Sequence, residues 1–440
     1  MVSLNQMRAD ARAAFDAAVQ AAQPRNLVPH WVQRVGDDVL VANEPLPRTT
    51  GRHVVMAIGK AAPGLAAAWL EAAPDWASEL FVLAPHKVPV PEEVGNAATV
   101  LHGAHPSPDS DGEQSTRTLL DVADSLQADD VLVVLLSGGG SALLAAPRDG
   151  LTLADIRTAT EVLLRAGAPI SEVNTVRRQL LAAAGGGLGR SASPARVRTL
   201  IVSDVLGDTL TDIASGPTVV SATTAADALE VLDRFALRGT VPSAVVALLA
   251  ATGGNPPDDG VWAAACTTRV IANNRTAVEA AALELRSRAY QVEVATEPLI
   301  GEASDRGREI AAAARTTESI TPTAVVMGGE TTVTVRGTGS GGRNQELALA
   351  AAIGIEDAGK IVVLAAGTDG IDGHSRNAGA IVDPTTVPRL RRLGLDQKAA
   401  LDNNDSGTAL EAVGDAIRTG PTSTNVCDVT LVLTAPQTDN

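Results

Sequence analysis

The sequence predicts an α/β protein with two domains, in which helices flank largely parallel sheets. Short runs of valine, isoleucine and leucine end in glycine-rich turns, and segments with helical spacing lie between them. This alternation of strands and helices is the pattern of parallel α/β sheets. The runs are continuously apolar, which is typical of strands buried on both faces. They cover residues 53–62, 131–141, 197–208, 323–335 and 360–373.

Several helices and one domain boundary follow from the same pattern. The N-terminal 22 residues have apolar positions three and four apart and predict an amphipathic helix, as do residues 154–167 and 275–290. The stretch ATGGNPPDDG is polar and rich in turn formers, so it predicts a linker. The chain of 440 residues is long enough for this division. We therefore expect an N-terminal α/β domain over residues 1–240 and a C-terminal α/β domain over 241–440.

Composition excludes several classes of protein. A net charge of −16 argues against general affinity for nucleic acid or an anionic membrane. No apolar run reaches the roughly 20 residues of a membrane span, and the N-terminus lacks the pattern of a signal peptide, so we expect a cytoplasmic protein. Cys266 and Cys427 are far apart and predict neither a disulfide framework nor a zinc site.

The stretch VLVVLLSGGGSALL places three glycines between a buried strand and a helix. Ligands of open parallel sheets bind at the carboxyl ends of the strands. The glycines let backbone N–H groups point at one anion, and two serine hydroxyls can add hydrogen bonds. Neither a Walker A motif nor a GxGxxG fingerprint is present. We expect an anion site, with a plain tight turn as the alternative, at Ser137, Gly138, Gly139, Gly140 and Ser141.

Lys60 and His105 are two further candidates for binding a ligand, and each lies in a loop or turn outside the triple-glycine stretch. Lys60 stands at a predicted helix start, where its charge opposes the helix dipole. A bound phosphate or carboxylate would explain this position, and a solvated lysine is the alternative. His105 lies in the turn-rich stretch HGAHPSPDSDG and could orient a ligand oxygen or simply occupy a turn.

Carboxylates gather after two further strands. Asp204 is the acidic residue nearest the end of the strand RTLIV, and such a group can hold Mg²⁺ or accept a proton from a hydroxyl. Asp212, further along, can merely cap or solvate a helix. Asp369 and Asp372 lie among glycines in GTDGIDG, where a metal site or a series of Asx turns is expected.

The stretch GTGSGGRNQELALAAA is the most specific local pattern. A glycine-rich loop precedes Arg343, Asn344 and an Ala/Leu-rich helix. A guanidinium at this point can bind phosphate or carboxylate through two hydrogen bonds. Glu346, in the first turn, is expected to help cap the helix.

Nine motifs occur in the order seen in the MOFRL-type, or class II, glycerate 2-kinases, and the chain resembles that family over nearly its whole length. The motifs are AIGKAA, GAHPSPD, LLSGGGSALL, VNTVRRQLL, SDVLGDTLTDIASGPT, MGGETTVTV, GGRNQELALA, GTDGIDG and NDSGTAL with TGPTSTNV. The resemblance implies a Rossmann-like N-terminal domain of glycerate-kinase type, a C-terminal MOFRL-type domain and an active-site cleft between them. It also implies transfer of the ATP γ-phosphate to the 2-hydroxyl of D-glycerate, with Mg²⁺.

The resemblance also suggests roles for single residues. The lysine of the GK motif and the arginine of GGRNQE, which are Lys60 and Arg343 here, match the family's proposed catalytic pair. Asp204 would orient the attacking hydroxyl, and Asp204, Asp369 and Asp372 are candidate metal ligands. The expected substrate- and nucleotide-binding residues are Ser137, Gly138, Gly139, Gly140, Ser141, His105, Arg177, Arg178 and Asn344.

Departures from the family pattern leave the acceptor open. Ala184 and Gly187 replace a lysine and an arginine, and residues 373–380 read GHSRNAGA in place of GPTDAAGA. The alternatives to D-glycerate are another hydroxy acid or sugar acid, or a non-catalytic ligand-binding member. An NAD(P)-dependent reductase is a further alternative, although the dinucleotide fingerprint is lacking. The expected partners are a small hydroxy acid and ATP, and a homo-oligomer is left open.

Overall fold

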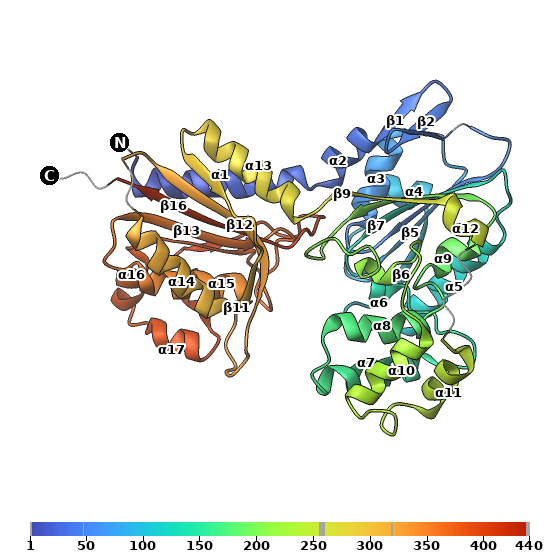
Figure 1. Ribbon diagram of the computed structural model, residues 1–440. Helices are drawn as coiled ribbons and strands as arrows, with labels where there is room; N and C mark the ends of the chain where they lie inside the picture. Colours follow the sequence, from blue (N-terminus) through green and yellow to red (C-terminus); the bar gives the residue numbers. More distant parts are fainter. Residues whose placement is uncertain (1, 47, 255–259, 318–319, 437–440) are drawn as a thin grey trace. The chain divides into compact units, whose positions relative to one another are not determined.

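The structure is a computed structural model that describes residues 2–46, 48–254, 260–317 and 320–436. The chain divides into two compact units (Figure 1). We call Pro24–Ile271 the N-terminal unit, and Met1–Gln23 together with Ala272–Asn440 the C-terminal unit. The units meet at residue 271 rather than at the expected 240, because the strand Cys266–Ala272 joins the sheet of the N-terminal unit. The first helix packs with the second half of the chain. The predicted linker at 251–260 includes residues 255–259, which lie outside the described residues.

A six-stranded sheet forms the centre of the N-terminal unit, and its neighbouring strands from β6 to β8 run parallel, as expected. Every residue of the two central strands, β4 and β7, is buried, which explains their continuously apolar sequences. In sheet order, the strands are β6 (Thr99–Gly103), β5 (Glu79–Pro85), β4 (His53–Ile58), β7 (Val131–Ser137), β8 (Arg196–Val202) and β9 (Cys266–Ala272).

Helices cover this sheet (Figure 1). A small antiparallel sheet of three strands precedes it in the chain. Leu119 of α5 and Leu188 of α9 pack into the same apolar core as the sheet strands. The helices are α2 (Pro24–Trp31), α3 (Ala62–Ala72), α4 (Glu92–Ala97), α5 (Ser110–Asp124), α6 (Gly140–Leu143), α9 (Gly187–Ser191) and α12 (Gly260–Ala265), and the small sheet contains β1 (Val32–Val35), β2 (Asp38–Val41) and β3 (Glu44–Leu46).

Four further helices of the N-terminal unit form a subdomain with an apolar core of its own. They are α7 (Leu153–Arg165), α8 (Ile170–Leu180), α10 (Ala225–Arg234) and α11 (Ser243–Thr252). Complete capping boxes begin α7 at Thr152 and α10 at Thr224, which fixes where these helices start. The short 3₁₀ helix η1 (Ile213–Ser215) lies between β8 and α10 in the sequence.

The sheet of the C-terminal unit is mixed, so the expectation of a largely parallel sheet is wrong for this half. The last strand, β16, lies between β12 and β13 and runs antiparallel to both. β14 also pairs antiparallel with β13, because the chain returns between them without the crossover helix that a parallel pair requires. The strands are β10 (Gln291–Val294), β11 (Leu299–Glu302), β12 (Thr323–Thr332), β13 (Lys360–Gly367), β14 (Gly379–Val382), β15 (Ala416–Ile417) and β16 (Asp428–Ala435).

Helices lie on both faces of the mixed sheet, with α1 beside α13 and α14 beside α15 (Figure 1). Helix α1 is tied to this unit by two ion pairs of Arg8, with Asp383 and Asp415, each at 2.7 Å. The helices are α1 (Leu4–Ala21), α13 (Asn274–Ser287), α14 (Ala303–Thr316), α15 (Arg343–Gly354), α16 (Thr386–Arg392), α17 (Gln397–Asp402) and α18 (Ser406–Ala412). In the described part of the chain, no helix combines the length and the apolar character that crossing a membrane demands.

Candidate functional site

Side chains from several loops meet the triple glycine at the carboxyl edge of the parallel sheet. Strand β7 ends at Ser137, and Gly139 takes φ +85° before α6, a conformation that glycine adopts readily. A Cβ atom on Gly138 would lie 1.8 Å from Asp204 Oδ2, and one on Gly139 would lie 3.1 Å from His105 Cδ2 and 3.2 Å from Lys60 Cγ. The glycines are therefore required because these three side chains approach the backbone.

The turn that carries Lys60 is hydrogen-bonded to this loop. The Lys60 backbone N–H donates to the Gly138 carbonyl oxygen at 2.9 Å. Ser137 Oγ accepts from the Ala61 N–H at 3.0 Å and is 2% exposed. The Ser137 hydroxyl therefore joins β7 to the turn after β4, and the ligand contact that we expected of it stays a prediction. The Lys60 side chain makes no ion pair within residues 48–254.

His105 is neutral at physiological pH in this arrangement. The protein atoms around the ring and the positive charge of Lys60 lower its pKa to about 4, although the residue as a whole is exposed. A neutral imidazole offers one donor and one acceptor nitrogen. His105 can thus exchange hydrogen bonds with a ligand beside Gly139, as the sequence predicts, but it adds no positive charge.

The two adjacent arginines of α8 have different environments. Arg177 Nη2 donates to the Ser141 carbonyl oxygen at 2.5 Å, while Arg177 Nε is buried without a partner in the described part of the chain. Burial lowers the pKa of Arg177, and no nearby charge offsets this effect. Arg178 instead donates to Asp212 Oδ1 at 2.9 Å and to the Thr211 carbonyl oxygen at 3.1 Å. Arg177 therefore brings an uncompensated cation to the glycine loop, whereas Arg178 connects α8 to the loop before η1.

Ser141 is connected to the end of the motif SDVLGDTLTDIASGPT, whose serine at position 215 had no expected role. Its hydroxyl lies 2.9 Å from the Ser215 hydroxyl. A Cβ on Gly140 would lie only 2.5 Å from the Ala214 Cβ, so this loop also presses on the glycines. Ala214 and Ser215 have positive φ values of 49° and 62°, which are uncommon for residues with side chains. The motif IASGPT therefore shapes the back of the glycine loop.

In the C-terminal unit, Arg343 begins α15 and is surrounded by acids. Its Nε and Nη2 donate to the two oxygens of Asp428 at 2.5 and 2.9 Å, and its Nη1 lies 2.8 Å from Glu330 Oε1. Burial alone would lower the pKa of Arg343, but the hydrogen bond and charge of Asp428, with Glu330, raise it above the usual value. The sequence analysis missed both acids.

Asp372 caps the helix that Arg343 begins. Its Oδ1 accepts from the Asn344 backbone N–H at 3.1 Å and from Asn344 Nδ2 at 3.3 Å, and its Oδ2 accepts from the Gln345 N–H at 2.8 Å. Burial raises the pKa of Asp372 to about 7 despite these bonds, and the charge of Asp428 contributes. Asp372 and Asn344 thus have structural partners, and Asp372 takes the capping role that we expected of Glu346.

Asp369 lies at the end of β13, close to Asp428. A Cβ on Gly367 would be 3.2 Å from Asp369 Oδ1 and 3.3 Å from Asp428 Oδ1. Asp369 Oδ1 also accepts from the Ile371 N–H at 3.1 Å, which is the predicted Asx turn. Carboxylate oxygens are the ligands that Mg²⁺ prefers. Asp369 and Asp204 fit that chemistry, whereas both oxygens of Asp372 are used by the helix.

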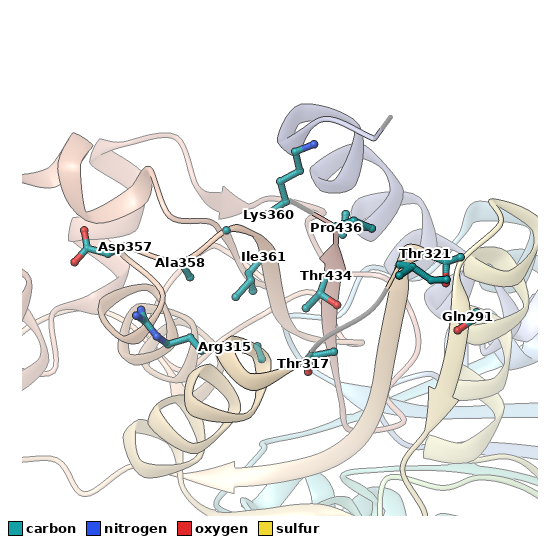
Figure 2. A pocket seen from close by; sticks show the side chains of 14 residues that line it. Gln291, Arg315, Thr317, Thr321, Asp357, Ala358, Lys360, Ile361, Thr434 and Pro436 are labelled. Carbon is teal, nitrogen blue, oxygen red and sulfur yellow. The ribbon is translucent and has the colours of Figure 1, made fainter. Parts of the chain in front are cut away.

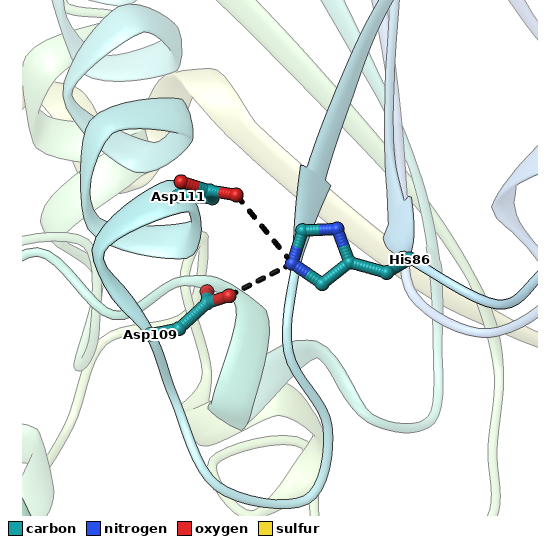
Figure 3. Close-up of side chains that lie close together, drawn as sticks. All are labelled: His86, Asp109 and Asp111. Atoms are coloured by element: carbon teal, nitrogen blue, oxygen red, sulfur yellow. Dashed lines mark hydrogen bonds and ion pairs between the residues drawn. The ribbon is translucent and has the colours of Figure 1, made fainter.

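A different group of residues has the spacing of metal ligands. His86 Nε2 lies 2.8 Å from Asp109 Oδ2 and 3.7 Å from Asp111 Oδ2 (Figure 3). Within the described ranges, no other three His, Cys, Asp or Glu side chains meet so closely. Asp109 also caps α5 by accepting from the Gly112 N–H at 2.9 Å. Ion pairing and helix capping account for this exposed group without a metal.

The C-terminal unit contains a cavity of about 890 Å³ (Figure 2). Gln291 and Lys360 line it at the starts of β10 and β13, together with Thr434 near the end of β16. Asp369 and Asp428 lie at the opposite end of β13. The cavity is therefore separate from the predicted site residues.

The sequence of the chain is similar to those of two known protein families. Residues 10–250 match a domain of unknown function, DUF4147, and residues 323–428 match the MOFRL family. The D-glycerate 2-kinase of Thermotoga maritima is 37% identical over 402 residues, which cover 89% of this chain and 93% of that protein. The chain belongs to the MOFRL/DUF4147 glycerate kinase family. This confirms the resemblance and the expected class of enzyme, a glycerate-kinase-type phosphotransferase that acts on an alcohol group.

One solved structure and a further relative by sequence are similar to this chain over nearly its whole length. The crystal structure of glycerate kinase from T. maritima has a TM-score of 0.84 and 32% identity, with 98% of this chain and 99% of that chain covered. A protein of Agrobacterium vitis, named provisionally as a hydroxypyruvate reductase, is 38% identical over 96% of this chain and 93% of its own length. The family thus contains proteins with kinase names and proteins with a reductase name.

Proposed function

We propose that the chain transfers the γ-phosphate of ATP to the 2-hydroxyl of D-glycerate and so forms 2-phosphoglycerate. The observation that carries the proposal is the approach of Lys60, His105 and Asp204 to Gly138 and Gly139. The relative from T. maritima named D-glycerate 2-kinase supports the acceptor. A cytoplasmic location stays a prediction from the sequence.

The N-terminal unit supplies a positive, glycine-lined surface for anionic oxygens. Phosphoryl transfer depends mainly on positioning and on groups that stabilise negative charge. Lys60 and Arg177 bring cations to the glycine loop, and the neutral His105 can fix an oxygen by hydrogen bonding. Asp204, which lies against Gly138, is the carboxylate placed to orient the hydroxyl and accept its proton.

The C-terminal unit would contribute directed donors and a carboxylate. Arg343 has two N–H donors left beyond those that face Asp428 and Glu330. We propose Asp204 or Asp369 as a residue that holds Mg²⁺, and Asp372 as a residue that orders the start of α15 rather than a ligand. When bound, Mg²⁺ neutralises charge on the nucleotide phosphates.

Transfer to another hydroxy acid or sugar acid is the second candidate, and one local feature favours it. Gly187 stands where the family pattern has an arginine, and a Cβ there would lie 1.9 Å from the Ala182 carbonyl oxygen. Ala184 is 2% exposed. Neither position therefore provides a cation for a substrate anion, and a different pattern of charges can select a different acceptor.

An acceptor screen tests both candidates. The purified chain with ATP, Mg²⁺ and a panel of hydroxy and sugar acids should release ADP fastest with D-glycerate, and ³¹P NMR should identify 2-phosphoglycerate. A clear preference for another acid would support the second candidate. ATP binding without turnover on any acceptor, or NAD(P)H oxidation with hydroxypyruvate, would contradict the kinase proposal.

A further inference from the structure

The guanidinium of Arg343 is held on two sides by acids from different strands. Asp428, the first residue of β16, takes Nε and Nη2, and Glu330 of β12 takes Nη1. Two of the five N–H donors of the guanidinium are thus hydrogen-bonded to Asp428, and Nη1 forms an ion pair with Glu330 within the C-terminal unit. Because the guanidinium is planar and rigid, holding its Nε–Nη2 edge against Asp428 also fixes the directions of its remaining N–H donors.

The two acids differ in how firmly they are held. The Asp428 side chain is 6% exposed, whereas that of Glu330 is 43% exposed. The backbone of Asp428 pairs with Gly329 and with Gly367, and Asn274 Nδ2 donates to the Asp428 carbonyl oxygen at 3.0 Å. The Asp428 side chain is therefore buried and held in place beside Arg343, whereas that of Glu330 is largely open to solvent.

The charge balance also determines what Arg343 can do. One guanidinium faces two carboxylates, so the group as a whole offers no excess positive charge to an anion. Its contribution must come from the direction of its free N–H donors. Such hydrogen bonds depend steeply on angle and distance, and a displacement of about 1 Å at a reacting group can reduce the rate about 100-fold.

We propose that Asp428 is a positioning residue of the phosphotransferase, with Glu330 in a secondary role, and that it acts by fixing the orientation of the Arg343 guanidinium. The proposal rests on the proposed function, because it assumes that Arg343 contacts the transferred phosphoryl group. A simple structural ion pair between α15 and β16 is the alternative. That alternative predicts a loss of stability without a specific effect on turnover.

Substitution of Asp428 distinguishes the positioning role from a purely structural ion pair. Asp428→Asn keeps the size of the side chain and replaces one acceptor oxygen with an NH₂ group that faces the guanidinium. We expect kcat to fall about 10- to 100-fold while the KM values for ATP and acceptor change less than about 3-fold. Glu330→Gln should lower kcat less, because Glu330 is exposed and touches a single nitrogen.

Asp383→Asn is the matched control. Asp383 also lies in the C-terminal unit, has a buried side chain and pairs with an arginine, Arg8, at 2.7 Å. It should lower the melting temperature about as much as Asp428→Asn, and it should leave kcat of the folded protein unchanged. An equal loss of kcat in the two variants, at equal folded fraction, would overturn the proposal.

Rescue with free guanidinium provides a second test. Arg343→Ala leaves a space bordered by Asp428 and Glu330, and millimolar guanidinium should restore part of its activity. The double variant Arg343→Ala with Asp428→Asn should not respond. Equal rescue of both proteins would contradict the positioning role. Full activity of Arg343→Ala without guanidinium would likewise overturn the positioning role. Absence of ATP-dependent phosphorylation in the wild type would instead contradict the proposed function, so the two failures are distinguishable.

Discussion

The Lys60 backbone N–H donates to the Gly138 carbonyl oxygen at 2.9 Å and so joins the GK turn to the triple-glycine loop. This bond places the lysine beside the glycines through the main chain, independently of the side chain. The side chain is therefore free to act on a ligand, and removing it need not disturb the loop.

We predict that Lys60→Ala lowers kcat about 100-fold or more, because it removes a charge that would stabilise the transferred phosphoryl group. The melting temperature should stay within a few degrees of that of the wild type, since the backbone bond to Gly138 remains. Coupled ADP release and thermal unfolding measure the two quantities. Lys398→Ala, at an exposed position of α17, is the control and should retain full activity. Unchanged turnover of the Lys60 variant would reject the role.

Gly139→Ala and Gly150→Ala form a matched pair. The two glycines have φ values of +85° and +86°, so alanine costs each about 1 kcal/mol of backbone strain. A Cβ on Gly150 meets nothing within 4 Å, whereas one on Gly139 meets His105 and Lys60 at 3.1 and 3.2 Å. Gly139→Ala should therefore lose at least as much stability as Gly150→Ala, as measured by urea unfolding, and only Gly139→Ala should lose activity. Equal activity of the two would show that His105 and Lys60 need not approach this point.

The pKa of Asp372 predicts a specific dependence of stability on pH. Burial raises this pKa to about 7, far above the value of about 3.9 in an unfolded chain. Between these values the folded state binds more protons than the unfolded state, so the contribution of Asp372 to stability is full below about pH 4 and is lost as pH rises to about 7. The slope cannot exceed about 1.4 kcal/mol per pH unit for one proton.

Urea unfolding of the wild type and of Asp372→Asn at several pH values tests this dependence. The asparagine keeps an oxygen that can accept from the start of α15, but it does not titrate. The wild type should lose stability relative to the variant as pH rises from 5 to 7. A constant difference between the two proteins over this range would mean that Asp372 stays ionised in the folded protein.

The parts of the fold that the sequence predicts are those with a local signal. The buried strands β4 and β7 are continuous apolar runs, and the triple glycine marks the close approach of other groups. The partners of Arg343 have no such signal, because Asp428 is 85 residues away and becomes its neighbour only when β16 enters the sheet between β12 and β13. Helix α1 is amphipathic, but its pattern does not say which unit its apolar face will join.

The adjacent residues Arg177 and Arg178 should have opposite effects when each is replaced by methionine. Arg178 pairs with Asp212, whose side chain is 24% exposed, so Arg178→Met leaves a partly buried carboxylate unpaired and should cost about 1–3 kcal/mol of unfolding free energy. Arg177 has no neighbouring acid to balance its charge, so Arg177→Met should be neutral or stabilising. The same change should raise the KM for ATP or for the acceptor about 10-fold, because it removes a cation beside Ser141. Urea unfolding of both variants measures the change in unfolding free energy, and steady-state kinetics measure the KM values for ATP and acceptor. A loss of stability in the Arg177 variant with unchanged KM would assign this arginine to the fold rather than to the site.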